Sequence, residues 1–353
     1  MNPKCCAHGG RSDRGGWGVR DSARVNRDPE PTSGQIPAVG LIVKSLDCLT
    51  IFSSTREKIE TVGFVGVGAM GDPMSAQVAA AGFRTLIHDA DPARAQRLAA
   101  EDERIAADLD AIAAADAVVL MLPNSDVVEA VLLDEGLLER MRPGSVLIDM
   151  SSSDARRTLA LGPTVAAREV DFADAPVSGG VARAESGELT AIVGAAADLL
   201  ARIEPLLRSM AANVFRVGGL GSGHAAKALN NLLSATGLLI SIEAVEAGRR
   251  FGIDPATLLE LLNVSTGMNH ATQTKIDRYV LSGRFDSGFR AELMLKDLRL
   301  ARAIVADAGL GTELADAVVE QWAAATEQLP AGADQTEIHH VTAGTEPAAQ
   351  EAR

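Results

Sequence analysis

Residues 61–71 read TVGFVGVGAMG, a short strand-like run that leads directly into a G-x-G-x-x-G pattern. The residues from Pro73 to Ala81 are typical of a helix, and a second strand-like run, Arg84–His88, ends at Asp89. Glycines alone are weak evidence in a chain that contains 33 of them. The order of strand, glycine turn, helix, strand and acid is specific, however, and it predicts a Rossmann-type dinucleotide-binding unit.

The glycine turn and the acid together predict which cofactor binds. In a Rossmann unit the turn approaches the pyrophosphate, and the helix after it offers free N–H groups. The predicted cofactor contacts are Gly66, Val67, Gly68, Ala69, Met70 and Gly71. Asp89 can accept both ribose hydroxyls and would repel a 2′-phosphate, so we expect NAD, with NADP less favoured. The competing interpretation is an ordinary strand–turn–helix unit with incidental glycines.

The same alternation of strands and helices continues as far as Val217. Further predicted strands are Ala117–Leu122, Ser145–Asp149, Val170–Ala175, Leu189–Val193 and Asn213–Val217, with helices over Asp108–Ala115 and Asp198–Arg208. Fully apolar strands such as the first of these are typical of a buried parallel sheet. Loops at the carboxyl ends of such strands line the ligand crevice, so Leu122, Pro123 and Asn124 are candidate cofactor contacts.

Two polar turns in this unit are candidate ligand sites. After the strand that ends at Asp149, residues 151–154 read SSSD and would either cap a helix or face the nicotinamide or substrate. Ser178, Gly179 and Gly180 expose consecutive backbone N–H groups and a hydroxyl, which suits a substrate carboxylate. A tight turn would use the same three residues, so both interpretations stay open.

Strand signals stop after Val217, and the chain becomes helical. The run Ala225–Phe251 would be about 40 Å long as one helix, enough to connect two domains. Four more helices are predicted, over Pro255–Asn263 with Asp254 as N-cap, Asn269–Leu281, Glu292–Ala308 and Glu313–Glu327. We therefore predict an α/β Rossmann-type N-terminal domain over residues 58–219, joined by a long interdomain helix to an all-α C-terminal domain over residues 220–342. The composition of residues 1–57 is typical of a disordered extension, and residues 343–353 read as a polar tail.

Lys227 lies at the start of the long helix, directly after a second glycine-rich turn that reads GGLGSG over residues 218–223. Asn231 follows four residues later, so both side chains point to one face of the helix. Their neighbours Leu229, Leu232 and Leu233 are apolar, and we expect this face to enter an interior. Burial would lower the pKa of the lysine toward the range useful for proton transfer, whereas a surface lysine beside a helix cap is the alternative.

Several other charged residues have open roles. Lys296 and Asp297 interrupt an apolar stretch, and they form either a structural ion pair or a contact from Lys296 to the cofactor or substrate. His339 and His340 have no partner at metal-ligand spacing, so we expect exposed loop histidines. We expect a structural role for His224, which lies near a helix start.

The composition excludes several classes of function. The chain has 353 residues and a net charge of −14, with only 3% aromatic residues, which disfavours a nucleic-acid partner. Its three cysteines, Cys5, Cys6 and Cys48, form neither a disulfide framework nor a metal-ligand spacing. We therefore expect no metal and a reducing, cytoplasmic location. No run approaches the length of a membrane span, so no membrane partner is expected.

Taken together, these motifs resemble the β-hydroxyacid dehydrogenase family, the group that contains 3-hydroxyisobutyrate dehydrogenase and tartronate semialdehyde reductase. Four blocks carry the resemblance, at residues 63–71, 174–180, 223–231 and 293–298, and it extends over residues 60–342. The resemblance implies reversible hydride transfer between NAD(P) and the hydroxyl carbon of a small β-hydroxyacid. It also implies a homodimer or homotetramer.

The resemblance further implies roles for individual residues. Lys227 matches the proton-transfer residue of the family, and Asn231 matches the asparagine that helps to hold the substrate. The block Ser178–Gly180 matches the carboxylate site. Ser152 and Lys296 match residues that contact the cofactor region.

Departures from related patterns narrow the predicted function. Residues 227–231 read KALNN and lack the Lys-x-x-His-Asn pattern of 6-phosphogluconate dehydrogenases, which disfavours a phosphosugar. Imine reductases of the same fold usually lack this lysine. We therefore predict a dehydrogenase of a small 3-hydroxyacid, or a reductase of the matching semialdehyde, with Lys227 as general acid/base. The alternatives are a reductase of another small carbonyl, imine or sugar acid, and a non-catalytic NAD-binding interaction module.

Overall fold

The computed structural model describes residues 58–345, which belong to one compact unit. The predicted extension over residues 1–57, with all three cysteines, and most of the predicted polar tail lie outside the described residues. In the described part the strands are β1 (Thr61–Val65), β2 (Arg84–His88), β3 (Ile105–Ala106), β4 (Ala117–Leu120), β5 (Val146–Asp149), β6 (Asp171–Asp174), β7 (Val177–Ser178), β8 (Leu189–Gly194) and β9 (Ala211–Gly218).

The helices include all those that the sequence predicts, with one correction. In the described residues they are α1 (Gly71–Ala80), α2 (Pro92–Glu101), α3 (Leu109–Ala113), α4 (Ser125–Glu129), α5 (Leu137–Arg140), α6 (Ala155–Ala166), α7 (Gly180–Glu185), α8 (Ala197–Met210), α9 (Ser222–Phe251), α10 (Pro255–Asn263), α11 (His270–Thr274), α12 (Ala291–Asp307), α13 (Glu313–Gln328) and α14 (Ile338–Ala343). The single helix predicted over Asn269–Leu281 is wrong, because α11 is followed by a π-helical segment, Ile276–Leu281. The turn widens at Lys275, whose side chain points inward and bonds to Ser234 and Gln335.

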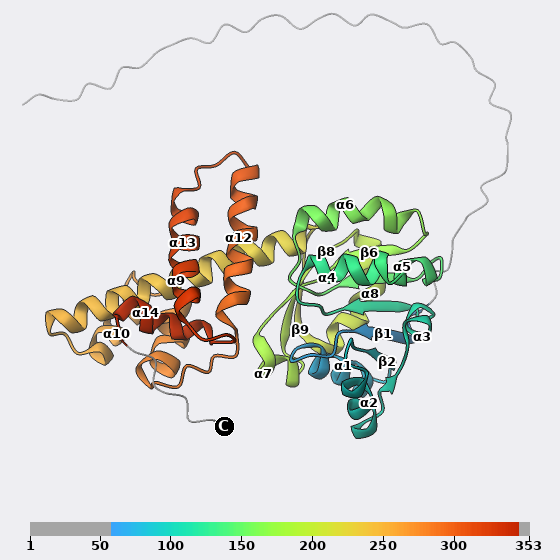
Figure 1. Cartoon of the computed structure of the whole chain (residues 1–353), viewed down its shortest axis with the longest axis horizontal. Coiled ribbons are helices and arrows are strands. Elements are labelled where there is room, and N and C mark those ends of the chain that lie inside the picture. The colour runs from blue at the N-terminus through green and yellow to red at the C-terminus, as the bar shows by residue number, and fades with distance from the viewer. Residues whose placement is uncertain (1–57, 346–353) are drawn as a thin grey trace, which may run out of the picture. The chain divides into compact units, whose positions relative to one another are not determined.

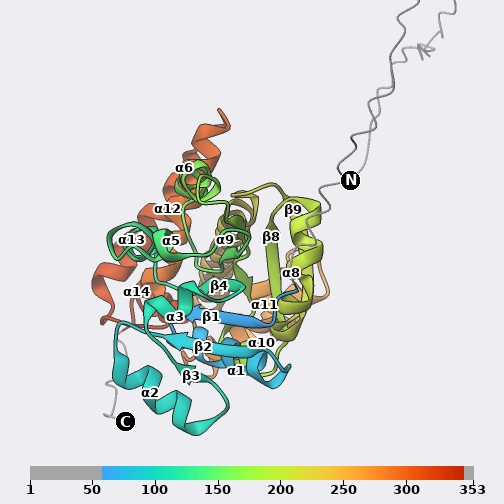
Figure 2. The same ribbon diagram turned by 90° about the vertical axis from the view of Figure 1, so that its right-hand side faces the viewer.

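The sheet has the strand order of a doubly wound dinucleotide-binding fold. Strands β1 to β6 run parallel in the spatial order β3-β2-β1-β4-β5-β6, and Figure 2 shows β1 beside β2 and β4. The order reverses between β1 and β4, so the ligand crevice is expected at the carboxyl ends of these two strands. β8 joins antiparallel to β6 and pairs with β7 and β9, which makes this edge of the sheet mixed.

Helices cover both faces of the sheet because its central strands are mostly apolar, and β4 is apolar at every position. Neighbouring residues of a strand point to opposite faces. In β4, Val119 packs in the core cluster that contains Met74 of α1, and Val118 packs in a second cluster that contains Ile112 of α3. The four residues of β4 are fully buried, as the sequence predicts for a parallel strand.

The long helix α9 leads from the sheet to the helices α10–α14 (Figure 1). Near its start it contacts β8 and α6, and further along it contacts α10, α11, α12 and α14. A separate core forms among these helices around Trp322, Ile276 and Leu298, which are fully buried. The predicted fold class, a Rossmann-type domain followed by a long helix and an all-helical domain, is confirmed.

The prediction that no run approaches a membrane span is wrong on length and composition. Helix α9 contains an 18-residue window with a mean hydropathy of 1.4. Within the protein, however, 44% of that window is buried, and the helix carries the buried polar residues Lys227, Asn231 and Glu246. A helix that crosses two cores needs apolar residues on several sides, and this accounts for the hydropathy of α9.

The prediction of exposed loop histidines near the C-terminus is also wrong. His339 and His340 belong to α14, and His340 is only 8% exposed. Nε2 of His339 lies 3.0 Å from Oε1 of Glu246, a buried residue of α9. These histidines therefore anchor the last helix against α9.

Candidate active site

The glycine turn has the geometry that a dinucleotide requires. Gly66 has a φ of +92°, and a Cβ atom there would lie 2.4 Å from the carbonyl oxygen of Met121. A Cβ atom on Gly71 would lie 1.9 Å from the carbonyl oxygen of Gly66. In contrast, a Cβ atom on Gly68 would meet nothing within 4 Å. The first and third glycines thus allow close packing, and the second leaves open space where a pyrophosphate would approach the backbone.

Asp89 lies directly beside this turn. Its Oδ2 accepts a hydrogen bond from the backbone N–H of Val67 at 3.0 Å, and its Oδ1 accepts one from Asp91 at 2.9 Å. Nη1 of Arg94 lies 3.4 Å from Oδ1 of Asp89. The carboxylate is therefore fixed at the end of β2, at the position where a ribose hydroxyl donates in this fold.

Arginines outside the sequence motifs also border the turn. A cavity of about 330 Å³ is lined by Gly68 and by three arginines, Arg94, Arg97 and Arg290. Arg290 precedes α12, so the helical domain contributes to this cavity. Positive charge beside the ribose position suits phosphate groups, and this observation bears on the choice between NAD and NADP.

The carboxyl ends of β4 and β5 meet Lys296. Nζ of Lys296 donates to the carbonyl oxygens of Pro123 at 3.2 Å and of Ser152 at 2.5 Å, and it lies 3.3 Å from Oδ1 of Asp297. Both predictions for Lys296 are therefore compatible with the structure, since it pairs with Asp297 and also reaches the ends of the strands. Three of the predicted cofactor contacts, Pro123, Ser152 and Lys296, are thus brought together.

Other residues of the loops after β4 and β5 make hydrogen bonds within the protein. The side chain of Asn124 accepts from the N–H of Val127 and caps α4. The backbone N–H of Leu122 donates to Oγ of Ser151 at 2.9 Å, which ties the end of β4 to the end of β5. Asp154 caps α6, as the cap interpretation of residues 151–154 predicts.

The start of α9 is held by a buried carboxylate from the sheet. Asp174, at the end of β6, accepts hydrogen bonds from the N–H groups of Gly221 at 2.6 Å and His224 at 2.7 Å. The side chain of Asp174 is fully buried, and burial raises its pKa although the adjacent His224 opposes the shift. Asp174 therefore acts as an N-cap supplied from a distant strand, which satisfies two free N–H groups at the start of α9.

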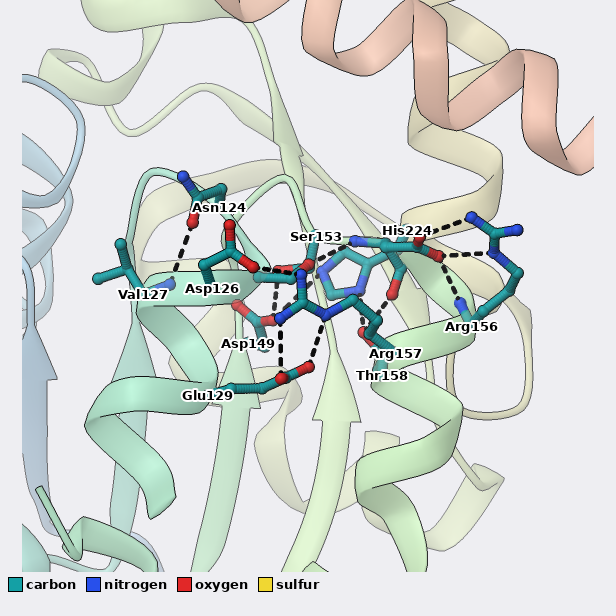
Figure 3. A network of polar contacts seen from close by, with 12 residues as sticks. Asn124, Asp126, Val127, Glu129, Asp149, Ser153, Arg156, Arg157, Thr158 and His224 are labelled. Carbon is teal, nitrogen blue, oxygen red and sulfur yellow. Dashed lines mark hydrogen bonds and ion pairs between the residues drawn. The ribbon is translucent and has the colours of Figure 1, made fainter. Parts of the chain in front are cut away.

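His224 connects this cap to the end of β5, and Figure 3 shows the polar network around it. Its Nδ1 lies 2.9 Å from Oγ1 of Thr158, and its Nε2 lies 3.7 Å from Oδ2 of Asp149. Asp149 accepts in turn from Oγ of Ser153 at 2.8 Å. The imidazole thus lies between the carboxylates of β5 and β6, which is the structural role that the sequence predicts.

Lys227 lies one turn after His224 and is only 7% exposed. Burial lowers the pKa of its amine, the nearby Lys296 lowers it further, and Asp297 opposes the shift. Within residues 58–345 its Nζ makes no hydrogen bond and no ion pair. The burial is as predicted. The prediction that Leu229 and Leu233 share this buried face is wrong, because these leucines are 37% and 76% exposed. Both leucines lie on other faces of α9.

Asn231 shares the buried face of α9 with Lys227 and is fixed by Asp297. Its Nδ2 donates to Oδ2 of Asp297 at 2.6 Å, and Asp297 also pairs with Lys296. A single carboxylate from α12 therefore orients Asn231 and Lys296 and lies close to Lys227. From the sequence, only an ion pair is predicted for Asp297, so its contact with Asn231 is an additional part of the site.

The turn Ser178–Gly180 lies at the start of α7. Gly179 and Gly180 have φ values of +139° and +72°, so both need the freedom of glycine. A Cβ atom on Gly179 would lie 2.9 Å from the Cβ of Arg183, which places that arginine beside the turn. Burial lowers the pKa of His270, and the positive charges of Lys275 and Arg183 lower it further. The charge of Arg183 on α7 therefore acts on His270, the first residue of α11.

Fold and site together define a class. The strand order, the glycine turn and Asp89 define a dinucleotide-binding protein, and a buried lysine, Lys227, lies on the same face of α9 as Asn231. Among the described residues there is no group of three His, Cys, Asp or Glu side chains that could hold a metal ion.

Comparisons with known proteins agree with this class. Residues 61–219 match the family described as the NAD-binding domain of 6-phosphogluconate dehydrogenase, and residues 221–342 match the NAD-binding region of NADP-dependent 3-hydroxyisobutyrate dehydrogenase. The chain is 35% identical to 2-(hydroxymethyl)glutarate dehydrogenase of Eubacterium barkeri, over 69% of this chain and 82% of the relative. It is 37% identical to the mitochondrial 3-hydroxyisobutyrate dehydrogenase of Bos taurus, over 68% of this chain and 74% of the relative.

A solved structure shares the fold closely. The 3-hydroxyisobutyrate dehydrogenase of Mycobacterium tuberculosis with L-serine has a TM-score of 0.74 and 30% identity, covering 80% of this chain and 99% of that one. The chain belongs to the 3-hydroxyisobutyrate dehydrogenase-like β-hydroxyacid dehydrogenase family, and it is an NAD(P)-dependent oxidoreductase of that family.

Proposed function

We propose that the protein oxidises the hydroxyl carbon of a small 3-hydroxyacid, or reduces the matching semialdehyde, with Lys227 as general acid/base. The single observation that carries this proposal is the environment of Lys227. Its amine is buried, has a lowered pKa and has no hydrogen-bond partner within the described residues. An amine in this state can accept the hydroxyl proton during oxidation and return it during reduction.

The remaining residues bind and orient. Gly66–Gly71 and Asp89 hold the cofactor, with Leu122, Pro123 and Asn124 along the crevice, and the bound nicotinamide supplies the hydride chemistry. Lys296 ties the loops after β4 and β5 to α12 through the carbonyl groups of Pro123 and Ser152. It thereby holds the helical domain against the cofactor crevice.

The substrate is held at two points. Ser178, Gly179 and Gly180 offer N–H groups and a hydroxyl to its carboxylate. Asn231, which Asp297 orients, would hydrogen-bond the hydroxyl group that reacts. Named relatives act on 3-hydroxyisobutyrate and 2-(hydroxymethyl)glutarate, and both substrates are 3-hydroxyacids with a primary alcohol. Tartronate semialdehyde is an aldehyde whose reduction at C3 gives a small 3-hydroxyacid with a primary alcohol.

For the cofactor we propose NAD, because Asp89 is fixed where it would accept the ribose hydroxyls and repel a 2′-phosphate. One specific observation favours NADP instead. Arg94, Arg97 and Arg290 line the cavity beside the turn, and Arg94 partly neutralises Asp89. The ratio of kcat/KM for the two cofactors decides between these alternatives.

We also propose that the protein is a homodimer or homotetramer. Helix α9 exposes large apolar side chains that a second copy would cover, since Leu233 is 76%, Ile240 55% and Phe251 85% exposed. Exposed apolar surface of this kind marks interaction sites in soluble proteins. Analytical ultracentrifugation of the purified protein measures its oligomeric state directly.

The test is an activity screen of C3 to C6 hydroxyacids with both cofactors, together with Lys227→Ala. We expect turnover of at least one 3-hydroxyacid and loss of that turnover in the variant. Turnover of an imine or sugar acid alone would favour a different reductase on this scaffold. Tight NAD(P) binding without any turnover would favour a non-catalytic binding module.

A further inference from the structure

A second buried lysine lies in the helical domain close to Lys227. Lys275 is only 8% exposed, and its Nζ donates to Oγ of Ser234 and Oε1 of Gln335, both at 3.2 Å. Both acceptors are neutral. In the part of the chain that the structure describes, no carboxylate lies within ion-pair distance of this amine, although Asp334 attracts it from further away.

A polar stripe on α9 connects the two lysines. Lys227, Asn231 and Ser234 follow one another at intervals of four and three residues, so they lie on one face of the helix. Lys227 and Ser234 are about 10 Å apart along the helix axis. Lys275, bonded to Ser234, therefore lies at the far end of the stripe, and its charge acts on the pKa of His270 as that of Arg183 does.

The charges around this stripe are predominantly positive in a chain whose net charge is −14. Lys227, Lys275 and Lys296 are the cations near it; of the carboxylates, Asp297 is already engaged by Asn231 and Lys296, and Asp334 lies beyond ion-pair distance from Lys275. Burial lowers the pKa of Lys275 to about 8, and the charge of Lys227 adds to the shift. At neutral pH most Lys275 side chains are still protonated, so among residues 58–345 this buried ammonium has no carboxylate within ion-pair distance.

We propose that Lys275, with Ser234, binds a second carboxylate of the substrate, so that the preferred substrate is a 3-hydroxyacid with a further acidic group at the end of its side chain. The proposal rests on the proposed function. The first carboxylate occupies the turn Ser178–Gly180, and the hydroxyl group lies at Lys227. A chain of two or three carbon atoms beyond C2 then directs the second carboxylate along the stripe toward Lys275.

Three substrates test the proposal on the wild-type protein. 2-(Hydroxymethyl)glutarate carries the second carboxylate, 2-(hydroxymethyl)pentanoate has a side chain of similar length without the charge, and 3-hydroxyisobutyrate has only a methyl group. All three share the same reacting alcohol. We expect kcat/KM to be at least roughly tenfold higher for the diacid than for the pentanoate, the effect of one charge-assisted hydrogen bond. Equal values would overturn the proposal.

Variants separate recognition from structure. Lys275→Met should lower kcat/KM for the diacid by roughly tenfold or more and leave that for the pentanoate within about threefold. Ser234→Ala should lower kcat/KM for the diacid relative to that for the pentanoate, but by a smaller factor. Lys58→Met removes an exposed positive charge elsewhere and should change neither. An equal loss on both substrates in Lys275→Met would assign the lysine a purely structural role.

A binding measurement does not depend on turnover. With NAD(H) or NADP(H) present, we expect glutarate to bind at least roughly tenfold more tightly than butyrate, and to lose this advantage in Lys275→Met. Equal affinities would reject the second anion site. Failure of the proposed function has a different result, which is no turnover of any of the three hydroxyacids with either cofactor.

Discussion

Replacing Lys275 with methionine should stabilise the protein at neutral pH when no ligand is bound. The pKa of this lysine falls from 10.5 to about 8 on folding, mainly because burial disfavours the charged amine. A shift of one pKa unit corresponds to about 1.4 kcal/mol, so keeping the charged side chain buried costs about 3 kcal/mol of folding stability at pH 7. Methionine is unbranched and flexible, so it can fill the space without that cost.

The substitution also removes two hydrogen bonds. Ser234 and Gln335 each lose a donor, which costs about 1–2 kcal/mol in total. We therefore expect the free energy of unfolding at pH 7 to rise by about 1–2 kcal/mol. Each kcal/mol corresponds to a rise in Tm of roughly 2–4 °C. A stability gain at a buried polar position is a sign that the residue is kept for function.

The pH dependence provides the decisive control. Between about pH 8 and 10.5 the unfolded chain binds more protons at this position than the folded chain, so the stability of the wild type rises with pH in that window. Lys275→Met lacks this rise, and its advantage should disappear near pH 10. The assay is urea unfolding at pH 7 and 9.5, in buffers free of polycarboxylates, with Lys58→Met as the matched control. A variant that is less stable by the same amount at both pH values would refute the reasoning.

Further perturbations test the rest of the site. Lys227→Ala should retain cofactor binding and lose a factor on the order of 10² or more in turnover. In the wild type we expect the oxidation rate to rise with pH around a midpoint below pH 10.5, and the variant should lack this rise. Unchanged turnover would remove this lysine from the mechanism. Asp89→Ser should shift the ratio of kcat/KM from NAD toward NADP, whereas Arg97→Ala should shift it toward NAD, and a wild type that strongly prefers NADP would contradict the role given to Asp89. Asp174→Ala should lower the free energy of unfolding by about 2–4 kcal/mol, because two buried N–H groups lose their acceptor; a change below about 0.5 kcal/mol, the level of a surface substitution, would show that water replaces the cap.

The parts of the fold that were predicted depend on local patterns. The glycine turn, the apolar run of β4 and the N-cap at Asp254 are each contained within a few residues, so the sequence alone indicates them. The sequence also predicts the burial of Lys227, but the apolar neighbours that suggest it, Leu229 and Leu233, are exposed. Helical spacing relates a residue to positions three and four away, and it does not tell which face of a helix meets the other domain.

The parts that were missed depend on contacts between distant segments. Asp174 caps α9 from positions 47 and 50 residues away in the sequence, and Asn231 and Asp297 are 66 residues apart. The sequence does not indicate a role for Lys275, because a single lysine in a predicted helix is most simply interpreted as solvated. Its side chain is held inward by Ser234 and Gln335, which are 41 and 60 residues away in the sequence.

The two buried lysines illustrate how similar burial can produce different chemistry. Both amines lose hydration, and in both cases burial is the main cause of the lowered pKa. Lys227 lies next to the cation Lys296, and the carboxylate of Asp297 that could hold its proton is shared with Asn231 and Lys296. This arrangement favours a neutral amine, which a proton acceptor must be. Lys275 has Asp334 in the vicinity, neutral oxygen acceptors and a pKa of about 8, so it keeps its charge at pH 7 and suits an anion. Because accepting a proton requires a neutral amine and binding an anion requires a charged one, the two proposed roles suit two lysines in different surroundings.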